Sequence, residues 1–176
     1  NGDEDETVPK PGDWQGINLL YPGGENVLKN AKVYYGSGAS AGGVIYNESL
    51  SLQLDSCYFF QSDSNAVYSS RSVMVTNCEL KNNKASGIFL NLENASAEIN
   101  LLNNQIENCS VFPVILKLGG TNVLFNSKGN TATGSEINAI VAENENLGNL
   151  KFRGDSLLPL LIDEGKVPES TAFIVE

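Results

Sequence analysis

A short apolar pattern recurs along most of this 176-residue chain and constrains its fold more than any other feature. In each copy, a small residue or a proline precedes an aliphatic residue. The aliphatic positions are spaced by 23, 21, 26 and 26 residues, and they are Val44, Val67, Ile88, Val114 and Ile140. A repeat of this length is typical of a solenoid, in which one structural unit stacks on the next.

A second pattern keeps a fixed phase to the first. It consists of polar residues, mostly asparagines, at Asn30, Ser56, Asn77, Asn103 and Asn126. Stacked asparagine amides can donate hydrogen bonds to carbonyl groups of the next unit, which satisfies them inside a tight bend. We therefore interpret this row as a structural ladder that needs no ligand.

The repeating units are too short for pairs of helices. They are rich in Val, Ile, Tyr and Phe, and Asn, Gly and Ser separate the apolar runs, as expected for short strands joined by turns. Extending the phase adds an earlier unit at Gly16-Ile17 and a later one at Leu161-Ile162. The sequence predicts an all-β, single-stranded parallel β-helix of about six to seven rungs, roughly 30 Å long at ordinary strand spacing.

We expect residues 1–176 to form a single β-helix domain, with an acidic segment over residues 1–13 leading into it. Residues 14–143 are predicted to form the regular rungs, and residues 144–176 an irregular excursion followed by a final rung. The chain begins with Asn1 and ends within a strand-like run, which favours a fragment of a longer protein.

Composition excludes several classes of function. The formal net charge of −10 opposes binding to nucleic acid or to an anionic membrane surface. An apolar run long enough to span a membrane is lacking. Because the sequence contains no histidine, His-based catalytic triads and most zinc or copper sites are excluded. The acidic run at residues 3–6 lacks the spacing of a calcium loop, so neither a metal ion nor a cofactor is predicted.

Cys57 and Cys78 each follow a ladder residue in adjacent rungs, so we expect them to stack one above the other. Buried free thiols are the favoured state of this pair, and a disulfide is the alternative. Trp14 is interpreted as a packing or capping residue.

The chain resembles the right-handed β-helix proteins with pectate-lyase-like architecture, in particular repeat proteins exported by Bacteroidetes-type bacteria. Three stretches carry the resemblance, which extends over nearly the whole chain: Pro11–Ile17, Val73–Ile88 and Leu158–Asp163. It implies a right-handed helix, an extracellular or cell-surface location and contact with carbohydrate. It does not specify an activity, because the same scaffold carries enzymes, adhesins and inert spacers.

Alternation along the strands predicts which side chains face solvent. If Val44, Val67, Ile88, Val114 and Ile140 point inward, the next residue of each strand points outward. The predicted outward stripe consists of Ile45, Tyr68, Phe89, Ile115 and Val141.

Within that stripe, Tyr68 and Phe89 are candidates for an aromatic platform that binds a sugar ring or a partner protein. Polar residues at or just beyond the strand ends would supply hydrogen bonds, and these are Asn47, Arg71, Asn91 and Lys117. The alternatives are that other parts of the chain cover the stripe, or that the stripe or the open solenoid ends mediate self-association.

The predicted stripe contains no carboxylate, whereas a glycosidase needs two. We therefore predict a structural or binding scaffold that presents its surface to carbohydrate or a surface protein. A polysaccharide lyase or glycoside hydrolase is the alternative, and its best candidate residues are Asp55, Glu79 and Glu107 with Lys81.

Overall fold

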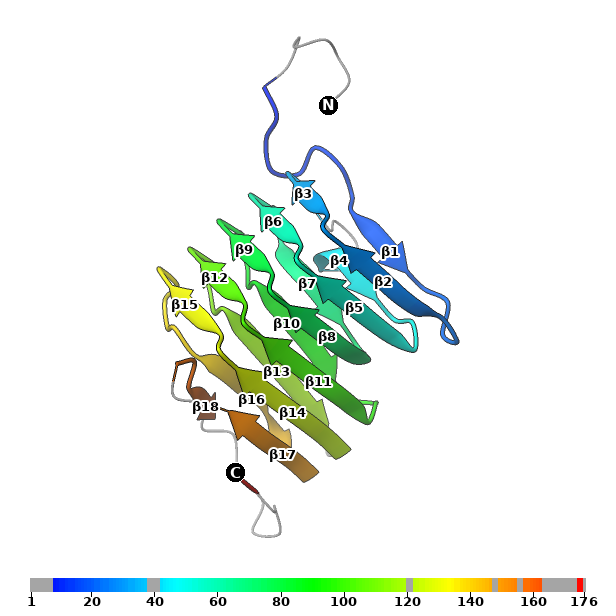
Figure 1. The fold of residues 1–176 in the computed structure, drawn as a ribbon, viewed down its shortest axis with the longest axis vertical. Coiled ribbons are helices and arrows are strands. Elements are labelled where there is room, and N and C mark those ends of the chain that lie inside the picture. Colours follow the sequence, from blue (N-terminus) through cyan, green and yellow to red (C-terminus); the bar gives the residue numbers. More distant parts are fainter. Residues whose placement is uncertain are drawn as a thin grey trace.

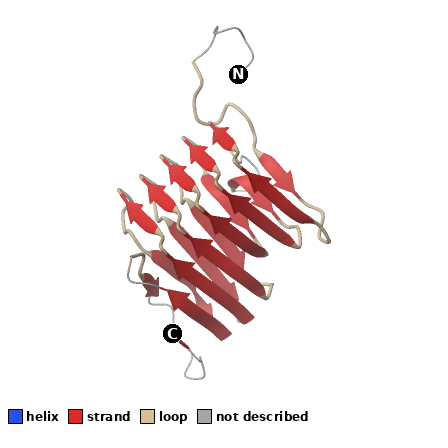
Figure 2. Cartoon of the chain, viewed as in Figure 1, coloured by secondary structure: helices blue, strands red, loops and turns tan. Residues whose placement is uncertain are grey.

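The computed structural model describes residues 8–37, 42–119, 122–146, 149–154, 157–162 and 174–175. These residues form strands and turns without a helix (Figure 2). The strands stack side by side in regular turns (Figure 1). The all-β solenoid predicted from the repeat is confirmed.

The strands form three parallel sheets, and each complete turn contributes one strand to each sheet. The first sheet contains β1 (Ile17–Leu19), β4 (Gly43–Asn47), β7 (Asn65–Ser69), β10 (Ile88–Leu92), β13 (Val114–Gly119), β16 (Ile140–Asn146) and β18 (Leu160–Ile162). The second contains β2 (Glu25–Lys29), β5 (Ser51–Asp55), β8 (Ser72–Thr76), β11 (Ala97–Leu102), β14 (Asn122–Lys128), β17 (Asn149–Gly154) and β19 (Ile174–Val175). The third, called here the narrow sheet, contains β3 (Lys32–Tyr34), β6 (Tyr58–Phe60), β9 (Glu79–Lys81), β12 (Gln105–Glu107) and β15 (Thr131–Thr133).

Among the described residues, five turns are complete, and two further turns add strands to the first and second sheets only. The prediction of six to seven rungs therefore agrees with the wider sheets. It overestimates the number of complete turns.

The interior is filled by inward rows of aliphatic and aromatic side chains, one residue from each turn. Leu52, Val73, Ile99, Phe125 and Phe152 form one such row across the second sheet. On the narrow sheet, Phe59, Leu80 and Ile106 form another. Because the rows run through successive turns, burial of apolar surface couples each turn to its neighbours.

The alignment of the first sheet differs from the prediction at one turn. Ile45, not Val44, pairs with Val67, and Tyr46 pairs with Tyr68. Ile45 is 1% exposed and belongs to the inward row, so its assignment to the outward stripe was wrong. The spacing between these turns is 22 residues, because the bend that joins them is one residue shorter than the apolar motif suggested.

Four of the five positions of the predicted asparagine row form a row of residues with left-handed backbone. Asn30, Ser56, Asn77 and Asn103 have φ values between 53° and 56°, a conformation that asparagine tolerates better than most residues. Each N–H donates to a carbonyl of the next turn, as from Asn103 to Lys128 over 2.8 Å. The bond comes from the backbone, whereas the prediction assigned it to the side chain.

Asn126 was wrongly placed in this row, because it lies within β14 and pairs with Asn100. The fifth left-handed position is Gly129, with φ of 68°. A glycine adopts that conformation without steric cost, so the row continues without an asparagine.

A buried polar ladder follows the left-handed row by one residue and contains Cys57, Cys78, Asn104 and Asn130. The Asn104 side chain accepts from the Cys78 N–H at 2.9 Å and donates to Asn130 Oδ1 at 2.8 Å and to Val75 O at 2.8 Å. The predicted stacking of the two cysteines is confirmed, and both are buried and unlinked in this structure.

Regular pairing continues beyond residue 143, which contradicts the predicted boundary of the irregular segment. The strand β17 pairs residue for residue with β14, and Leu150 and Phe152 point into the core. The apolar signal was weak here because polar residues precede and separate these two. The final rung is present at β18, although Ile140 pairs with Leu160 and not with Ile162. The acidic run at residues 3–6 lies outside the described residues.

Candidate functional site

The outward stripe of the first sheet contains three aromatic rings in successive turns, those of Tyr46, Tyr68 and Phe89. The Tyr46 and Tyr68 ring centroids lie 4.9 Å apart with an interplanar angle of 15°, and those of Tyr68 and Phe89 lie 5.5 Å apart at 8°. The Lys117 ammonium lies 5.8 Å from the Phe89 centroid. The rings therefore cover one another's faces, and we call the three residues the stacked row.

The remaining part of the stripe is more enclosed than predicted. Ile115 is 6% exposed and Val141 is 3% exposed. These two residues therefore offer little surface to a partner, whereas Leu161, which follows Val141 in the stripe, is 44% exposed.

The hydroxyl groups of the stacked row are engaged within the chain. The Tyr46 hydroxyl donates to Glu48 over 2.5 Å, and this bond is the main cause that raises the pKa of Tyr46 to about 12. The Asn91 amide donates to the Tyr68 hydroxyl over 3.1 Å. Of the four polar residues predicted to assist a ligand here, Asn91 and Lys117 therefore bind the rings themselves.

Asn47 was wrongly predicted to serve this surface. Its side chain is completely buried, donates to Ser69 Oγ over 2.9 Å and accepts from Ser49. Residue 47 shares the inward row with Ser69, because strand alternation places it on the opposite side from Tyr46. Arg71 is half-buried and donates to the Ser70 carbonyl at 3.2 Å.

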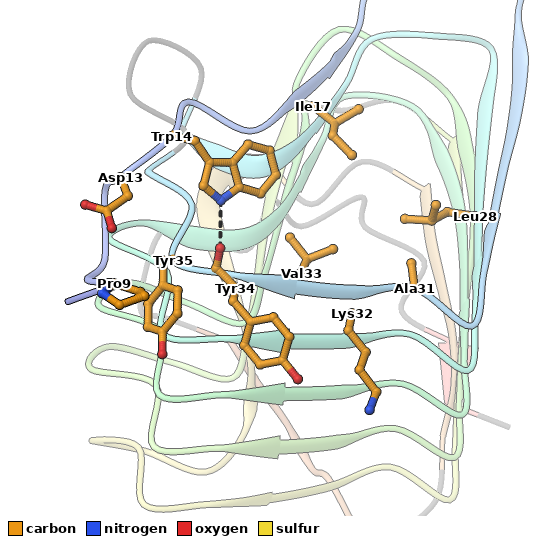
Figure 3. Close-up of a pocket in the computed structure, with 10 residues that line it drawn as sticks. All are labelled: Pro9, Asp13, Trp14, Ile17, Leu28, Ala31, Lys32, Val33, Tyr34 and Tyr35. Atoms are coloured by element: carbon orange, nitrogen blue, oxygen red, sulfur yellow. Dashed lines mark hydrogen bonds between the residues drawn. The ribbon is translucent and has the colours of Figure 1, made fainter. Parts of the chain in front are cut away.

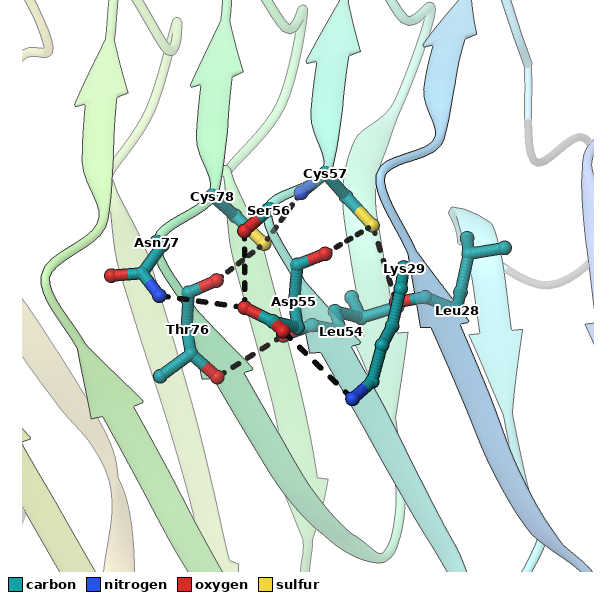
Figure 4. A network of polar contacts seen from close by, with 9 residues as sticks. All are labelled: Leu28, Lys29, Leu54, Asp55, Ser56, Cys57, Thr76, Asn77 and Cys78. Atoms are coloured by element: carbon teal, nitrogen blue, oxygen red, sulfur yellow. Dashed lines mark hydrogen bonds and ion pairs between the residues drawn. The ribbon is translucent and has the colours of Figure 1, made fainter.

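The predicted catalytic candidates separate into two places. Asp55 lies on the second sheet, where it accepts from the Asn77 amide at 3.4 Å and faces Lys29 at 4.0 Å (Figure 4). On the narrow sheet, Lys81 lies between Glu79 and Glu107, at 2.9 Å and 3.5 Å. The pKa of Lys81 is raised, first by its hydrogen bond to Glu79. Both carboxylates thus engage one ammonium group, which makes this cluster an ion-pair network.

The narrow sheet carries a second group of outward aromatic side chains, which sequence reasoning missed. Tyr34, Tyr58 and Phe60 come from β3 and β6, and we call them the aromatic cluster. The Tyr34 ring is tilted by 61° from Tyr58 and by 74° from Phe60. The Tyr58 and Phe60 rings stack on each other, with centroids 5.8 Å apart and an interplanar angle of 14°. The tilted Tyr34 ring is 37% exposed.

A groove of about 600 Å³ lies beside the aromatic cluster. Two tyrosine rings and several hydrogen-bonding side chains line it together: Asn30, Lys32, Tyr34, Ser56, Tyr58, Asn77 and Glu79. The left-handed bends explain this arrangement, because they project Asn30, Ser56 and Asn77 outward next to the start of the narrow strands. Inward and outward residues alternate within those strands. Aligning this alternation with the repeat could have predicted that the rings point outward.

A second hollow of about 540 Å³ lies at the end of the solenoid formed by the first turn. Its lining is largely apolar and includes Ile17, Leu28 and Val33 (Figure 3). The Trp14 indole N–H donates to the Tyr34 carbonyl over 2.6 Å, which fits the predicted packing role of this tryptophan.

Within the described residues, no group of three or more Cys, Asp or Glu side chains is placed to hold a metal ion. The same described residues contain no helix that is long and apolar enough to cross a membrane.

Comparison with known proteins supports the fold. A family model described as a right-handed β-helix region matches residues 15–156. No curated protein and no solved structure matches the chain. Because the family model covers most of the sequence and the strands form a parallel solenoid, this chain belongs to the right-handed β-helix family.

Proposed function

We propose that this protein is a non-catalytic scaffold that binds carbohydrate in the groove beside the aromatic cluster, and that it acts outside the cell. The observation that carries the proposal is that aromatic rings and hydrogen-bonding side chains line the same groove. Two partly exposed tyrosine rings lie beside amide, hydroxyl, ammonium and carboxylate groups.

Sugar recognition needs both kinds of group. The apolar C–H face of a sugar ring packs on an aromatic ring, while its hydroxyls need hydrogen-bond partners. Tyr34 and Tyr58 supply the rings, and the Asn30 and Asn77 amides with the Ser56 hydroxyl supply donors and acceptors. The stacked row supports binding less well, because its ring faces cover one another.

An enzymatic role has weaker support. General acid–base cleavage of a glycosidic bond requires one carboxyl group to donate a proton. Glu79 and Glu107 both pair with Lys81, so this cluster is better suited to holding a fixed charge network beside the groove.

Screening the wild-type chain on a glycan array, followed by calorimetry on the glycans that bind, tests this proposal. We expect Tyr58→Ala to weaken binding at least tenfold, about 1.4 kcal/mol, with Tyr34→Ala close behind. Tyr58→Phe, which keeps the ring, should retain most of the affinity. Circular dichroism establishes that each variant is folded.

Tyr68→Ala is the matched control, since it removes a ring from the other outward face. Loss of binding in Tyr68→Ala alone would place the site on the stacked row and contradict the proposed location. Absence of binding by the wild-type chain to any glycan would overturn the proposed function.

A further inference from the structure

Cys57 and Cys78 occupy equivalent positions in two successive turns, one residue after the left-handed bend. The Cys57 N–H lies 3.4 Å from Cys78 Sγ, as Figure 4 shows. Glu79 N–H donates to the Cys57 carbonyl at 2.9 Å, so the backbones of the two turns are paired at this point. The two thiols are therefore held next to each other by the register of the solenoid.

The backbone spacing suits a disulfide. Neighbouring strands lie about 4.8 Å apart, within the Cα–Cα range of about 4.4–6.8 Å found in disulfides. At present Cys57 Sγ points toward the preceding turn, 3.3 Å from the Leu28 carbonyl. A change of the Cys57 side-chain rotamer would turn this sulfur toward Cys78.

The folded protein protects both thiols from oxidants. Cys57 is 2% exposed and Cys78 is 1% exposed, and burial raises the pKa of Cys78 to about 12. Thiol–disulfide exchange requires a thiolate and access to it. Oxidation is therefore expected while the chain folds, before these turns close.

We propose that Cys57 and Cys78 are a disulfide-forming pair that links the second and third turns when the protein folds in the presence of a small-molecule or protein disulfide. One thiolate attacks the oxidant, forms a mixed disulfide and releases one thiol. The other thiolate then displaces the second thiol, so two cysteines are oxidised, one disulfide is reduced, and the two cysteine protons end on the released thiols.

The cross-link would join residues 21 positions apart and restrict the unfolded chain. It would also fix the spacing of Ser56 and Asn77, which directly precede the two cysteines and line the groove. This inference does not depend on carbohydrate binding, because it rests on the stacking of the thiols alone.

The test is to refold the reduced chain in a buffer of reduced and oxidised glutathione, then denature, alkylate and digest it with trypsin. We expect alkylation of Cys109 alone and a disulfide-linked pair of peptides, which cleavage after Arg71 makes separable on reduction. The oxidised protein should melt about 5–10 °C above the reduced protein.

Two variants keep the result interpretable. Cys109→Ser should retain the cross-link, because Cys109 lies at the other bend, beside Asn83. Cys78→Ser should lose both the cross-link and the difference in melting temperature. Alkylation of all three cysteines after refolding, a link that involves Cys109, or a lower melting temperature of the oxidised protein would each overturn the proposal.

Discussion

Aromatic side chains gather on two outward faces of this solenoid, and they pack differently on each. On the first sheet, Tyr46, Tyr68 and Phe89 share one row and stack nearly parallel. On the narrow sheet, Tyr34 is tilted against both Tyr58 and Phe60. In a parallel solenoid, aromatic side chains that occupy one row can pack face to face. On the narrow sheet, Tyr58 stacks only on Phe60 of its own strand, and its neighbours in the adjacent turns are Lys32 and Glu79, which line the groove with it.

This comparison separates stabilising rings from binding rings. A ring that stacks on both sides contributes cross-strand packing energy and loses accessible surface. A ring at the margin of a groove contributes less to folding and remains available. The three predictions below test this division, beginning with the largest expected effect on stability.

Truncating Tyr68 should cost more folding free energy than truncating Tyr58. We expect Tyr68→Ala to lower the free energy of unfolding by about 2–3 kcal/mol, because it removes two stacking contacts and the hydroxyl that accepts from Asn91. Tyr58→Ala should cost about 1 kcal/mol, since its ring borders the groove and has one stacking partner, Phe60. Urea denaturation measures both. Equal losses would remove the distinction between the two faces.

Replacing Asn47 should destabilise the chain through its interior. Asn47→Ala leaves the buried Ser69 and Ser49 hydroxyls without their amide partner, at a cost of about 2 kcal/mol. Asn91→Ala is the matched control, because Asn91 is only partly buried, and it should cost less than about 1 kcal/mol. A stable Asn47→Ala variant with impaired glycan binding would contradict this prediction and indicate that Asn47 contributes to a binding surface.

Titration of Tyr46 should show how strongly its hydrogen bond to Glu48 raises its pKa. Its folded-state pKa of about 12 lies above the ordinary value of 10.0, chiefly because the hydroxyl donates to Glu48. The hydrogen bond to Glu48 therefore stabilises the folded state in full below pH 10, and this stabilisation is lost as pH rises through about 12. Subtracting the ultraviolet titration of Tyr46→Phe from that of the wild type isolates this group.

The matched variant for that titration is Glu48→Gln, which removes the carboxylate. The pKa of Tyr46 should then fall toward its ordinary value. An unchanged titration in Glu48→Gln would show that the hydrogen bond to Glu48 is not what raises the pKa.

The sequence predicted the fold well because each turn repeats the same local requirements. A strand motif and a left-handed residue recur in each of the five complete turns, and Asn30, Asn77 and Asn103 mark the bends directly. The prediction failed at Asn126 because glycine replaces asparagine at the bend beside it, where either residue adopts positive φ.

The candidate site was less predictable. Placing Ile45 in the outward stripe followed from aligning motifs by their first aliphatic residue, and a change of one residue exchanges the inward and outward sides. The aromatic cluster was missed since its residues lie in three-residue strands, where alternation gives only two outward positions.

By itself, the sequence determined that this chain folds as a parallel solenoid with thiols and amides stacked at its bends. Local strand and turn preferences recur with one period, and burial of their apolar side chains requires the units to stack. Only the tertiary structure decided which residues of successive turns lie side by side, because bends of different length change that alignment. Contacts between turns therefore decided that Tyr68 belongs to a closed stack and Tyr58 to an open groove.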